Sequence, residues 1–227
     1  MRNVIFTYCN YQIDPRIAEN QSKVINKMIP NLNVDFPGPL FYNAKDGDMF
    51  PDQVIEYALD ILFYQQLYDN VLILDIDCIP LNPKALTYIF DKASNGYLIG
   101  NAQRSHYIEN NAHMFIGSSC ICINKTVFEQ LGKPKFTPTK RGDIAEELVY
   151  IAEARNMPVE FLVPHDYETS PHGAPEWALV GDLKPYGIGT TFMTMAGDLM
   201  FYHLFESRHN LNVERFLAKV QQVLNRE

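Results

Sequence analysis

NVLILDIDCIPL, residues 70–81, is the stretch that decides the fold. It begins with an apolar run from Val71 to Leu74, which has the length of a strand. An uninterrupted apolar run of this kind is typical of a central parallel strand that is covered on both faces. Two carboxylates follow at Asp75 and Asp77. Because side chains alternate between the faces of a strand, residues at i and i+2 point the same way.

The two carboxylates at the strand end need an explanation, because like charges beside a dry core are costly unless something cationic neutralises them. The carboxyl ends of strands are also where α/β proteins bind ligands. A divalent metal that carries a phosphate explains Asp75 and Asp77 economically. The alternative is a solvated strand end that leads into a turn at Pro80.

The rest of the chain alternates strand and helix patterns. Strands are expected at residues 4–8, 71–74, 97–101, 114–124, 159–163 and 199–203. Helices are expected to begin at Asp14-Pro15, Pro51 and Asn82-Pro83, to span Asp143 to Asn156, and to close the chain at about 212–225. Residues 132–142 and 164–198 are expected to be irregular. The pattern predicts one α/β domain over residues 1–227, with a mixed, mostly parallel sheet flanked by helices.

Composition limits the class of protein. The chain has 227 residues, 47% of them hydrophobic, and a formal net charge of −8. Disorder, a collagen-like fibre and a disulfide-stapled miniprotein are excluded, and a protein that coats nucleic acid or anionic membrane everywhere is not expected. No run reaches the ~18 apolar residues of a membrane span, so no integral membrane segment is expected. We interpret the four cysteines as reduced thiols and expect a cytoplasmic protein, in the host cytoplasm if the chain is viral.

Residues 70–81 resemble the DXD segment of the GT-A glycosyltransferases. In that family a strand delivers Asp-X-Asp to a Mn²⁺ or Mg²⁺ ion, and the ion clamps the diphosphate of a nucleotide sugar, most often a UDP-sugar. The resemblance extends over residues 3–209. It implies a GT-A-like, Rossmann-like fold and the activity of a hexosyl- or pentosyltransferase.

Other segments lie where that family would place them. Residues 6–10, FTYCN, resemble the nucleotide-binding first loop, so Thr7, Tyr8 and Asn10 are donor-binding candidates. A helix from Pro51 to Tyr68, just before the DXD strand, is typical of the family.

Two later segments extend the resemblance. FIGSSCICINKTVFEQL, residues 115–131, resembles the strand that lines the sugar pocket and then turns into a helix, so Gly117 and Ser118 are acceptor-binding candidates. FYHLFESRH, residues 201–209, resembles the C-terminal segment whose histidine completes the metal shell.

The resemblance implies a role for each of four side chains. Asp77 would bind the metal directly, Asp75 would bind the ribose or the metal, and His203 would be the third protein ligand. Arg208 would neutralise the leaving diphosphate. Taken alone, His203 would more often be a structural histidine. A mixed shell of two oxygens and one nitrogen suits Mn²⁺ at least as well as Mg²⁺.

Catalysis by inversion would also need a carboxylate that takes the proton of the acceptor. Asp143, Glu146 and Glu147, in GDIAEELVYIAEARN, are the candidates, and the resemblance places an acidic pair that serves the acceptor near this helix start. Asp143 and Glu146 are also spaced as a capping box, which would make them structural. A retaining enzyme would need no such base, so the stereochemistry stays open.

The expected acceptor is a hydroxyl of a glycan or glycolipid, or a hydroxymethylated base of DNA such as soluble bacteriophage transferases modify. Two clusters bear on it. His172 and Trp177 lie in the irregular segment, and aromatic rings stack on sugars and bases. Lys140 and Arg141 belong to a basic segment, residues 92–142, of an otherwise acidic chain, which fits a phosphate-bearing acceptor. A buried anchoring tryptophan and a solvated basic loop are the structural alternatives.

Two other classes of function share the strand-end carboxylates. A phosphatase of the haloacid dehalogenase type also begins with an apolar strand that ends in Asp-X-Asp. In that family the motif lies near the N-terminus, whereas here Asp75 is far along the chain, and Ile79 stands where the family has Thr or Val. The third class is a non-catalytic module that binds a nucleotide or a glycan.

Overall fold

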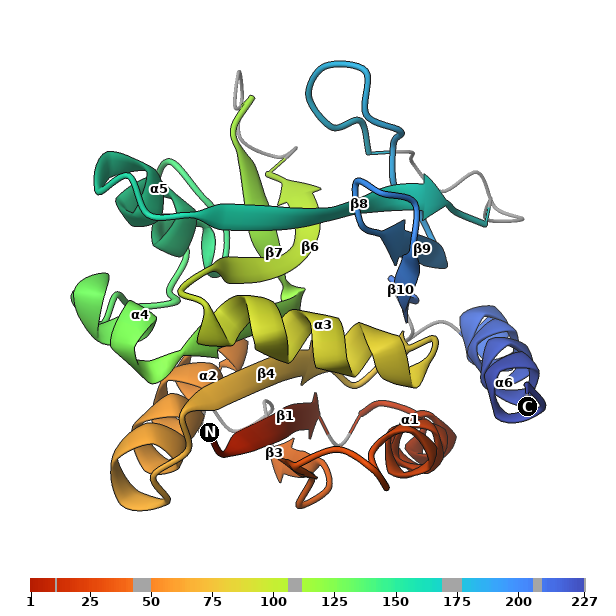
Figure 1. The fold of residues 1–227 in the computed structure, drawn as a ribbon. Coiled ribbons are helices and arrows are strands. Elements are labelled where there is room, and N and C mark those ends of the chain that lie inside the picture. Colours follow the sequence, from red (N-terminus) through yellow and green to blue (C-terminus); the bar gives the residue numbers. More distant parts are fainter. Residues whose placement is uncertain (11, 43–49, 106–111, 169–176, 206–209, 227) are drawn as a thin grey trace.

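The computed structural model describes residues 1–10, 12–42, 50–105, 112–168, 177–205 and 210–226. In Figure 1 a curled mixed sheet runs through the molecule with helices packed on both of its faces. The predicted class, an α/β fold with a mixed sheet flanked by helices, is confirmed.

Most of the predicted elements are present. The described strands are β1 (Asn3–Asn10), β2 (Val34–Asp35), β3 (Leu40–Tyr42), β4 (Asn70–Asp75), β5 (Cys78–Pro80), β6 (Leu98–Arg104), β7 (Met114–Asn124), β8 (Val159–Asp166), β9 (Thr190–Met193) and β10 (Leu199–His203). The helices are α1 (Pro15–Met28), α2 (Pro51–Asp60) with its π-helical continuation η1 (Ile61–Gln65), α3 (Pro83–Ser94), α4 (Lys125–Gln130), α5 (Glu146–Ala154) and α6 (Asn210–Leu224). None of the helices among these residues combines the length and apolar character that a bilayer crossing requires.

The strand order is β2-β1-β4-β7-β6-β8-β9-β10-β5, with β3 paired to β1. Parallel pairs join β1 to β2, β3 and β4, and join β6 to β8. Strand β4, which contains the 71–74 run, is parallel to β1 and antiparallel to β7, as a mixed sheet allows. Strand β7 also runs antiparallel to its other neighbour, β6.

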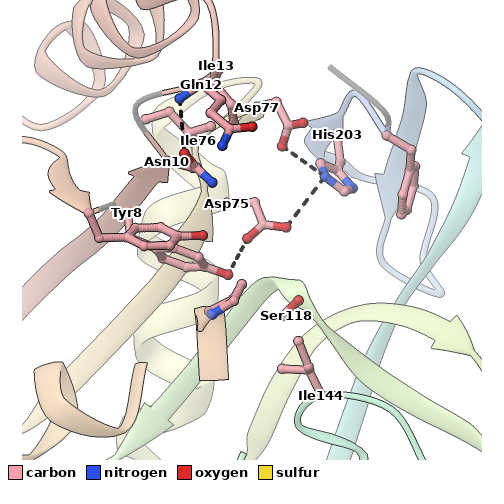
Figure 2. A pocket seen from close by; sticks show the side chains of 13 residues that line it. Tyr8, Asn10, Gln12, Ile13, Asp75, Ile76, Asp77, Ser118, Ile144 and His203 are labelled. Atoms are coloured by element: carbon pink, nitrogen blue, oxygen red, sulfur yellow. Dashed lines mark hydrogen bonds and ion pairs between the residues drawn. The ribbon is translucent and has the colours of Figure 1, made fainter. Parts of the chain in front are cut away.

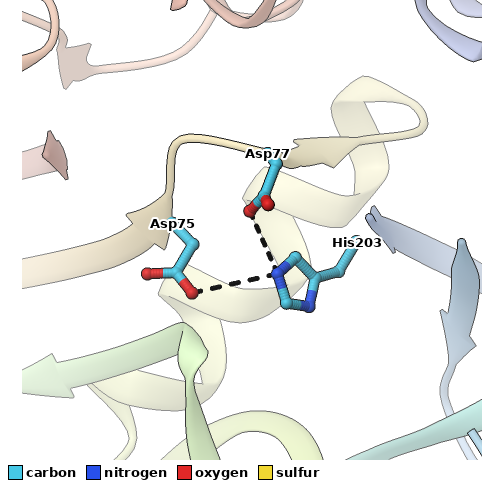
Figure 3. A group of neighbouring side chains, drawn as sticks. All are labelled: Asp75, Asp77 and His203. Carbon is cyan, nitrogen blue, oxygen red and sulfur yellow. Dashed lines mark hydrogen bonds and ion pairs between the residues drawn. The ribbon is translucent and has the colours of Figure 1, made fainter. Parts of the chain in front are cut away.

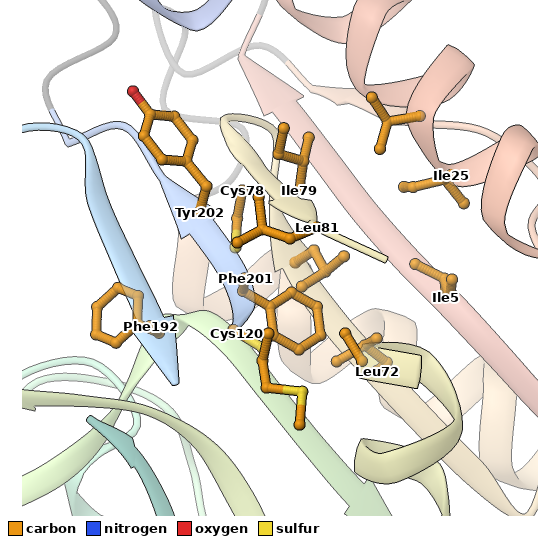
Figure 4. Close-up of a cluster of buried hydrophobic side chains, with 14 of the residues drawn as sticks. Ile5, Ile25, Leu72, Cys78, Ile79, Leu81, Cys120, Phe192, Phe201 and Tyr202 are labelled. Atoms are coloured by element: carbon orange, nitrogen blue, oxygen red, sulfur yellow. The ribbon is translucent and has the colours of Figure 1, made fainter. Parts of the chain in front are cut away.

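The 71–74 strand is central, as its apolar run predicts. Leu72 and Leu74 pack into a core shared with α1, α3 and α6, part of which Figure 4 shows. Val71 and Ile73 pack into a second core shared with α2, α4 and α5. All four side chains are fully buried, so both faces of β4 are covered and Asp75 is delivered from a rigid strand.

Three described helices begin at a side-chain cap, the third being α4, where Asn124 accepts from the backbone N–H of Thr126, whereas the start expected at Asp143 does not. The Asp14 side chain accepts from the backbone N–H of Arg16 at the start of α1, and Asn82 accepts from that of Ala85 at the start of α3. The helix expected from Asp143 begins instead at Glu146. Ala145 has φ +70°, a left-handed conformation that stops the helix from extending toward Asp143.

The irregular segment expected at 164–198 contains an element that sequence patterns did not indicate. Strand β9 lies within it and pairs with β8 and β10. Through β9 the sheet continues to β10, whose other neighbour is the short strand β5. This order brings the end of β10 beside the turn that follows β4.

Candidate functional site

Asp75, Asp77 and His203 converge at the end of β4, as Figure 3 shows. The His203 Nε2 atom lies 3.0 Å from Asp77 Oδ1 and 3.8 Å from Asp75 Oδ2. The side chains are 4%, 11% and 28% exposed for His203, Asp77 and Asp75 respectively. One ligand atom from each of the three lies within 4.8 Å of the others.

Strand pairing produces this convergence. Strand β4 ends at Asp75, and Asp77 follows in the turn rather than in the strand that the i, i+2 argument assumed. The next residue, Cys78, is the register partner of His203 in the antiparallel pair of β5 and β10. The backbone carbonyl of Asp77 also accepts from the N–H of Leu204 at 3.1 Å. The carboxylates therefore meet His203 because β10 is laid against β5.

The pKa values of Asp75 and His203 are shifted by burial and by the neighbouring charges. Burial and then the charge of Asp77 raise the pKa of Asp75. Burial alone would lower the pKa of His203, but the charge and hydrogen bond of Asp77 together with the charge of Asp75 outweigh it and raise that pKa. The site thus favours an added positive charge. Two carboxylate oxygens and an imidazole nitrogen are a donor set compatible with a divalent cation such as Mn²⁺ or Mg²⁺.

The cluster forms one wall of a cavity of about 320 Å³, seen in Figure 2. The cavity is lined by Tyr8, Asn10, Gln12, Ile13, Tyr42, Pro51, Asp75, Ile76, Asp77, Ser118, Ile144, His203 and Phe205. The residues that follow β1 and those that follow β4 thus face the same space, because β1 and β4 are parallel neighbours that end at one edge of the sheet.

Tyr8 connects the exit of β1 to the carboxylates. Its hydroxyl donates to Asp75 Oδ1 at 2.5 Å, and its ring is stacked on Phe6 and tilted against Tyr42. Burial, followed by the charge of Asp75, raises the pKa of Tyr8 well above its ordinary value, so the hydroxyl keeps its proton for this bond.

The other donor-binding candidates are placed differently. Asn10 lines the cavity, and its side-chain oxygen accepts from the backbone N–H of Gln12. Thr7 is fully buried within β1 and does not belong to the cavity lining. Arg208 lies outside the described residues.

The three candidate bases are near the cavity without lining it, whereas Ile144 between them does line it. Asp143 is half-buried, and one of its oxygens accepts from the backbone N–H of Ile144 at 2.7 Å. Glu147 pairs with Arg141 at 2.6 Å, and this hydrogen bond lowers the pKa of Glu147.

Glu146 is the most constrained of the three candidates, because its side chain is completely buried. It accepts from the Ser105 hydroxyl at 2.5 Å and from the backbone N–H of Asp143 at 2.8 Å, and it lies 2.8 Å from His113 Nδ1. The expected capping box is therefore half present, since Glu146 reaches back to the N–H of Asp143 although Asp143 does not cap α5.

The acceptor candidates fall into two groups. Ser118 lines the cavity, and Gly117 beside it packs so closely that an added Cβ would lie 2.0 Å from the side chain of Gln103. Lys140 is exposed on the 132–142 loop, and the guanidinium of Arg141 is engaged by Glu147.

Trp177 belongs to an aromatic cluster that reaches the metal candidates. Its ring centroid lies 5.4 Å from that of Tyr186 and 5.3 Å from that of Phe205. Phe205 in turn stands edge-on to His203 at 4.0 Å. His172, the other acceptor candidate of that segment, lies outside the described residues.

Several lining residues were not predicted from sequence, among them Tyr42, Ile144 and Phe205. Phe205 could have been found, because it stands two residues after His203. Tyr42 and Ile144 carry no local signal, since their places depend on β3 pairing with β1 and on the turn before α5.

No protein-family model matches the chain, and no curated protein matches it in sequence. Solved structures with a similar arrangement include A197 from STIV, at 15% identity and a TM-score of 0.44 over 88% of this chain and 93% of that one. A candidate nucleotide-diphospho-sugar transferase from Desulfovibrio desulfuricans G20 matches at 11% identity and a TM-score of 0.44, over 70% and 79% of the two chains. The glycosyltransferase GlyE of Streptococcus pneumoniae TIGR4 matches at 16% identity and a TM-score of 0.38, over 69% of this chain and 40% of that one. At these values the likeness concerns the arrangement of strands and helices alone.

Proposed function

We propose that this chain is a metal-dependent glycosyltransferase that moves a sugar from a nucleotide diphosphate, with UDP as the nucleotide, to a hydroxyl group. The observation that carries the proposal is the convergence of Asp75, Asp77 and His203 on the wall of a cavity that the exit of β1 also lines. Two carboxylates, one buried and one partly buried, that both face a buried histidine favour a bound cation, and the adjoining cavity has room for a ligand of that cation.

In the proposed reaction Asp75, Asp77 and His203 hold Mn²⁺ or Mg²⁺. The cation supplies Lewis-acid stabilisation of the negative charge that develops on the departing diphosphate. Tyr8 orients Asp75 through its hydroxyl, and Phe205 fixes the ring plane of His203 by edge-on contact. Asn10 is proposed to bind the nucleotide from the end of β1, where it lines the cavity.

Asp143 is the carboxylate that we favour as the base of an inverting mechanism. It is half-buried beside Ile144, which lines the cavity, whereas Glu146 is buried among its own partners and Glu147 is paired with Arg141. Determination of the anomeric configuration of the product decides whether such a base is needed at all.

The proposed acceptor is a hydroxyl of a glycan or glycolipid, with hydroxymethylated DNA as the competing substrate in the same assay. Ser118 and Phe205 line the cavity, and the ring of Phe205 contacts both His203 and Trp177, so that these aromatic rings would offer apolar faces for a sugar or a base. Lys140 and Arg141 would serve a phosphate-bearing acceptor.

Calorimetric titration of UDP with and without Mn²⁺ tests the proposal. UDP binding should require Mn²⁺, and Asp77→Asn should abolish this Mn²⁺-dependent binding while the variant remains folded. Asp198→Asn is the matched control, because Asp198 is exposed and pairs with Lys84 away from the cavity.

Activity assays separate the other classes of function. Hydrolysis of UDP-sugars with Mn²⁺ supports the proposal. Phosphate release from p-nitrophenyl phosphate would instead favour a phosphatase. Metal-dependent UDP binding without turnover on any acceptor would favour a binding module.

A further inference from the structure

Gln21 is a glutamine on the buried side of α1, and its side chain reaches the turn that carries the two aspartates. The residue is completely buried. Its Nε2 atom donates to the backbone carbonyl of Asp75 and to that of Cys78, both at 2.7 Å. One carboxamide therefore connects the first and last residues of the turn from Asp75 to Cys78.

The orientation of this amide follows from its partners. Both partners are carbonyl oxygens, so the NH₂ group must face the turn and Oε1 must face away. Within the described chain Oε1 is buried and has no hydrogen-bond partner. A buried amide that leaves its oxygen unpaired gains little stability for the helix that carries it. The two carbonyls of the turn explain why the amide lies there.

The turn is held from two sides. Gln21 binds its outer carbonyls from α1, and the N–H of Leu204 binds the carbonyl of Asp77 from the end of β10. In a turn without such hydrogen bonds, motion of the backbone would also move the carboxylates of Asp75 and Asp77. Here the backbone of both carboxylate-bearing residues is fixed relative to His203.

The same bonds connect two segments that line the cavity. Helix α1 follows closely on Gln12 and Ile13, which also line the cavity. The side chain of Gln21 thus ties the element after β1 to the turn after β4.

We propose that Gln21 is a positioning residue that fixes the turn from Asp75 to Cys78 and so presents Asp75 and Asp77 to the cation. The proposal rests on the metal-dependent function proposed above. Groups behind the ligands of a metal site contribute about 10- to 100-fold to metal affinity. Gln21 acts through the backbone of the ligands and is not expected to touch the metal or the substrate.

The test uses Gln21→Met, which keeps the length of the side chain and removes both donors. Asn70→Leu is the matched control. Asn70 is also a fully buried carboxamide, which donates to Asn3 and Ser94 and accepts from Asn124, but it lies at the opposite end of β4. Gln21→Asn is a second variant with lower risk to folding, because it keeps a buried amide. Its side chain is shorter by one methylene, so the amide cannot reach the carbonyls of Asp75 and Cys78 together.

The first measurement needs no metal. Amide hydrogen exchange of the peptide that covers residues 75–79 should become about tenfold faster in Gln21→Met and Gln21→Asn, because two hydrogen bonds are lost. In Asn70→Leu it should stay as in the unsubstituted protein. Unchanged exchange in the Gln21 variants would overturn the proposal.

The second measurement is Mn²⁺ affinity, followed by the electron paramagnetic resonance signal of free Mn²⁺. We expect it to fall about 10- to 100-fold in the Gln21 variants and to stay within about threefold in Asn70→Leu. Faster exchange with unchanged Mn²⁺ affinity would refute the role in presenting the carboxylates. If the unsubstituted protein binds no Mn²⁺, the proposed function fails, and the exchange result alone then decides whether Gln21 fixes the turn.

Discussion

Tyr8→Phe is the substitution that tests the site most selectively, because it removes one oxygen atom and leaves the packing in place. The ring of Tyr8 is buried and stacked on Phe6 at a centroid distance of 5.9 Å, and phenylalanine keeps that contact. What disappears is the bond of 2.5 Å from the hydroxyl to Asp75.

The size of the effect follows from the environment of Asp75. A hydrogen bond to a charged group contributes about 1.5–3 kcal/mol, which corresponds to about 10- to 150-fold in an equilibrium constant. The side chain of Asp75 is 28% exposed, so water can replace part of the lost bond. We therefore expect the lower end of the range, a Mn²⁺ affinity about tenfold weaker.

Mn²⁺ titration followed by electron paramagnetic resonance measures this effect directly. Tyr68→Phe is the matched control, because Tyr68 donates to Asp35 at 2.8 Å, the same pair of groups away from the cavity. The control should bind Mn²⁺ like the unsubstituted protein. Equal Mn²⁺ affinity for Tyr8→Phe and Tyr68→Phe would refute the claim that Tyr8 orients a metal ligand.

Three further predictions concern stability and pH. Glu146→Ala should lower the free energy of unfolding by about 3 kcal/mol or more, because the buried Ser105 hydroxyl and the N–H of Asp143 lose their acceptor. Denaturant unfolding measures this change. A large loss of transferase activity with unchanged stability would instead identify Glu146 as the base. Arg141→Gln should lower the melting temperature slightly at pH 7 and by less at a pH below the lowered pKa of Glu147. The hydrogen bond of Arg141 holds the pKa of Glu147 below its ordinary 4.5, so the pair stabilises the fold above that value, and its contribution is lost as the pH falls through the lowered pKa. An equal loss at both pH values would contradict this. Gly100→Ala should cost about 3 kcal/mol or prevent folding, because its Cβ would lie 1.9 Å from the backbone oxygen of Cys120; a variant with unchanged unfolding would show that the strands can separate there.

The sequence predicts those parts of the fold that depend on local patterns. The apolar run of β4 and the caps at Asp14 and Asn82 each carry their signal within a few residues, and all three are confirmed. Strand β5 is short, and β9 lies in a segment with many turn residues, so neither shows a period that could be recognised.

The site depends more on contacts between distant segments. The position of Asp75 and Asp77 follows from β4, but His203 reaches them through the pairing of β5 with β10, which no local pattern specifies. Glu146 matches a local capping rule, yet its burial is set by contacts with a segment far from it in sequence. Gln21 did carry a signal, a polar residue within the apolar stripe of a helix, but its partners became known only from the fold.

The central claim is that Asp75, Asp77 and His203 hold a cation that in turn holds a diphosphate. Anomalous diffraction from crystals soaked with Mn²⁺ and UDP tests it most directly. We expect an anomalous peak within about 2.3 Å of one oxygen of each aspartate and of His203 Nε2, with the diphosphate on the cavity side of the ion. A peak elsewhere, or UDP bound in the cavity with no metal between it and these three residues, would contradict the account.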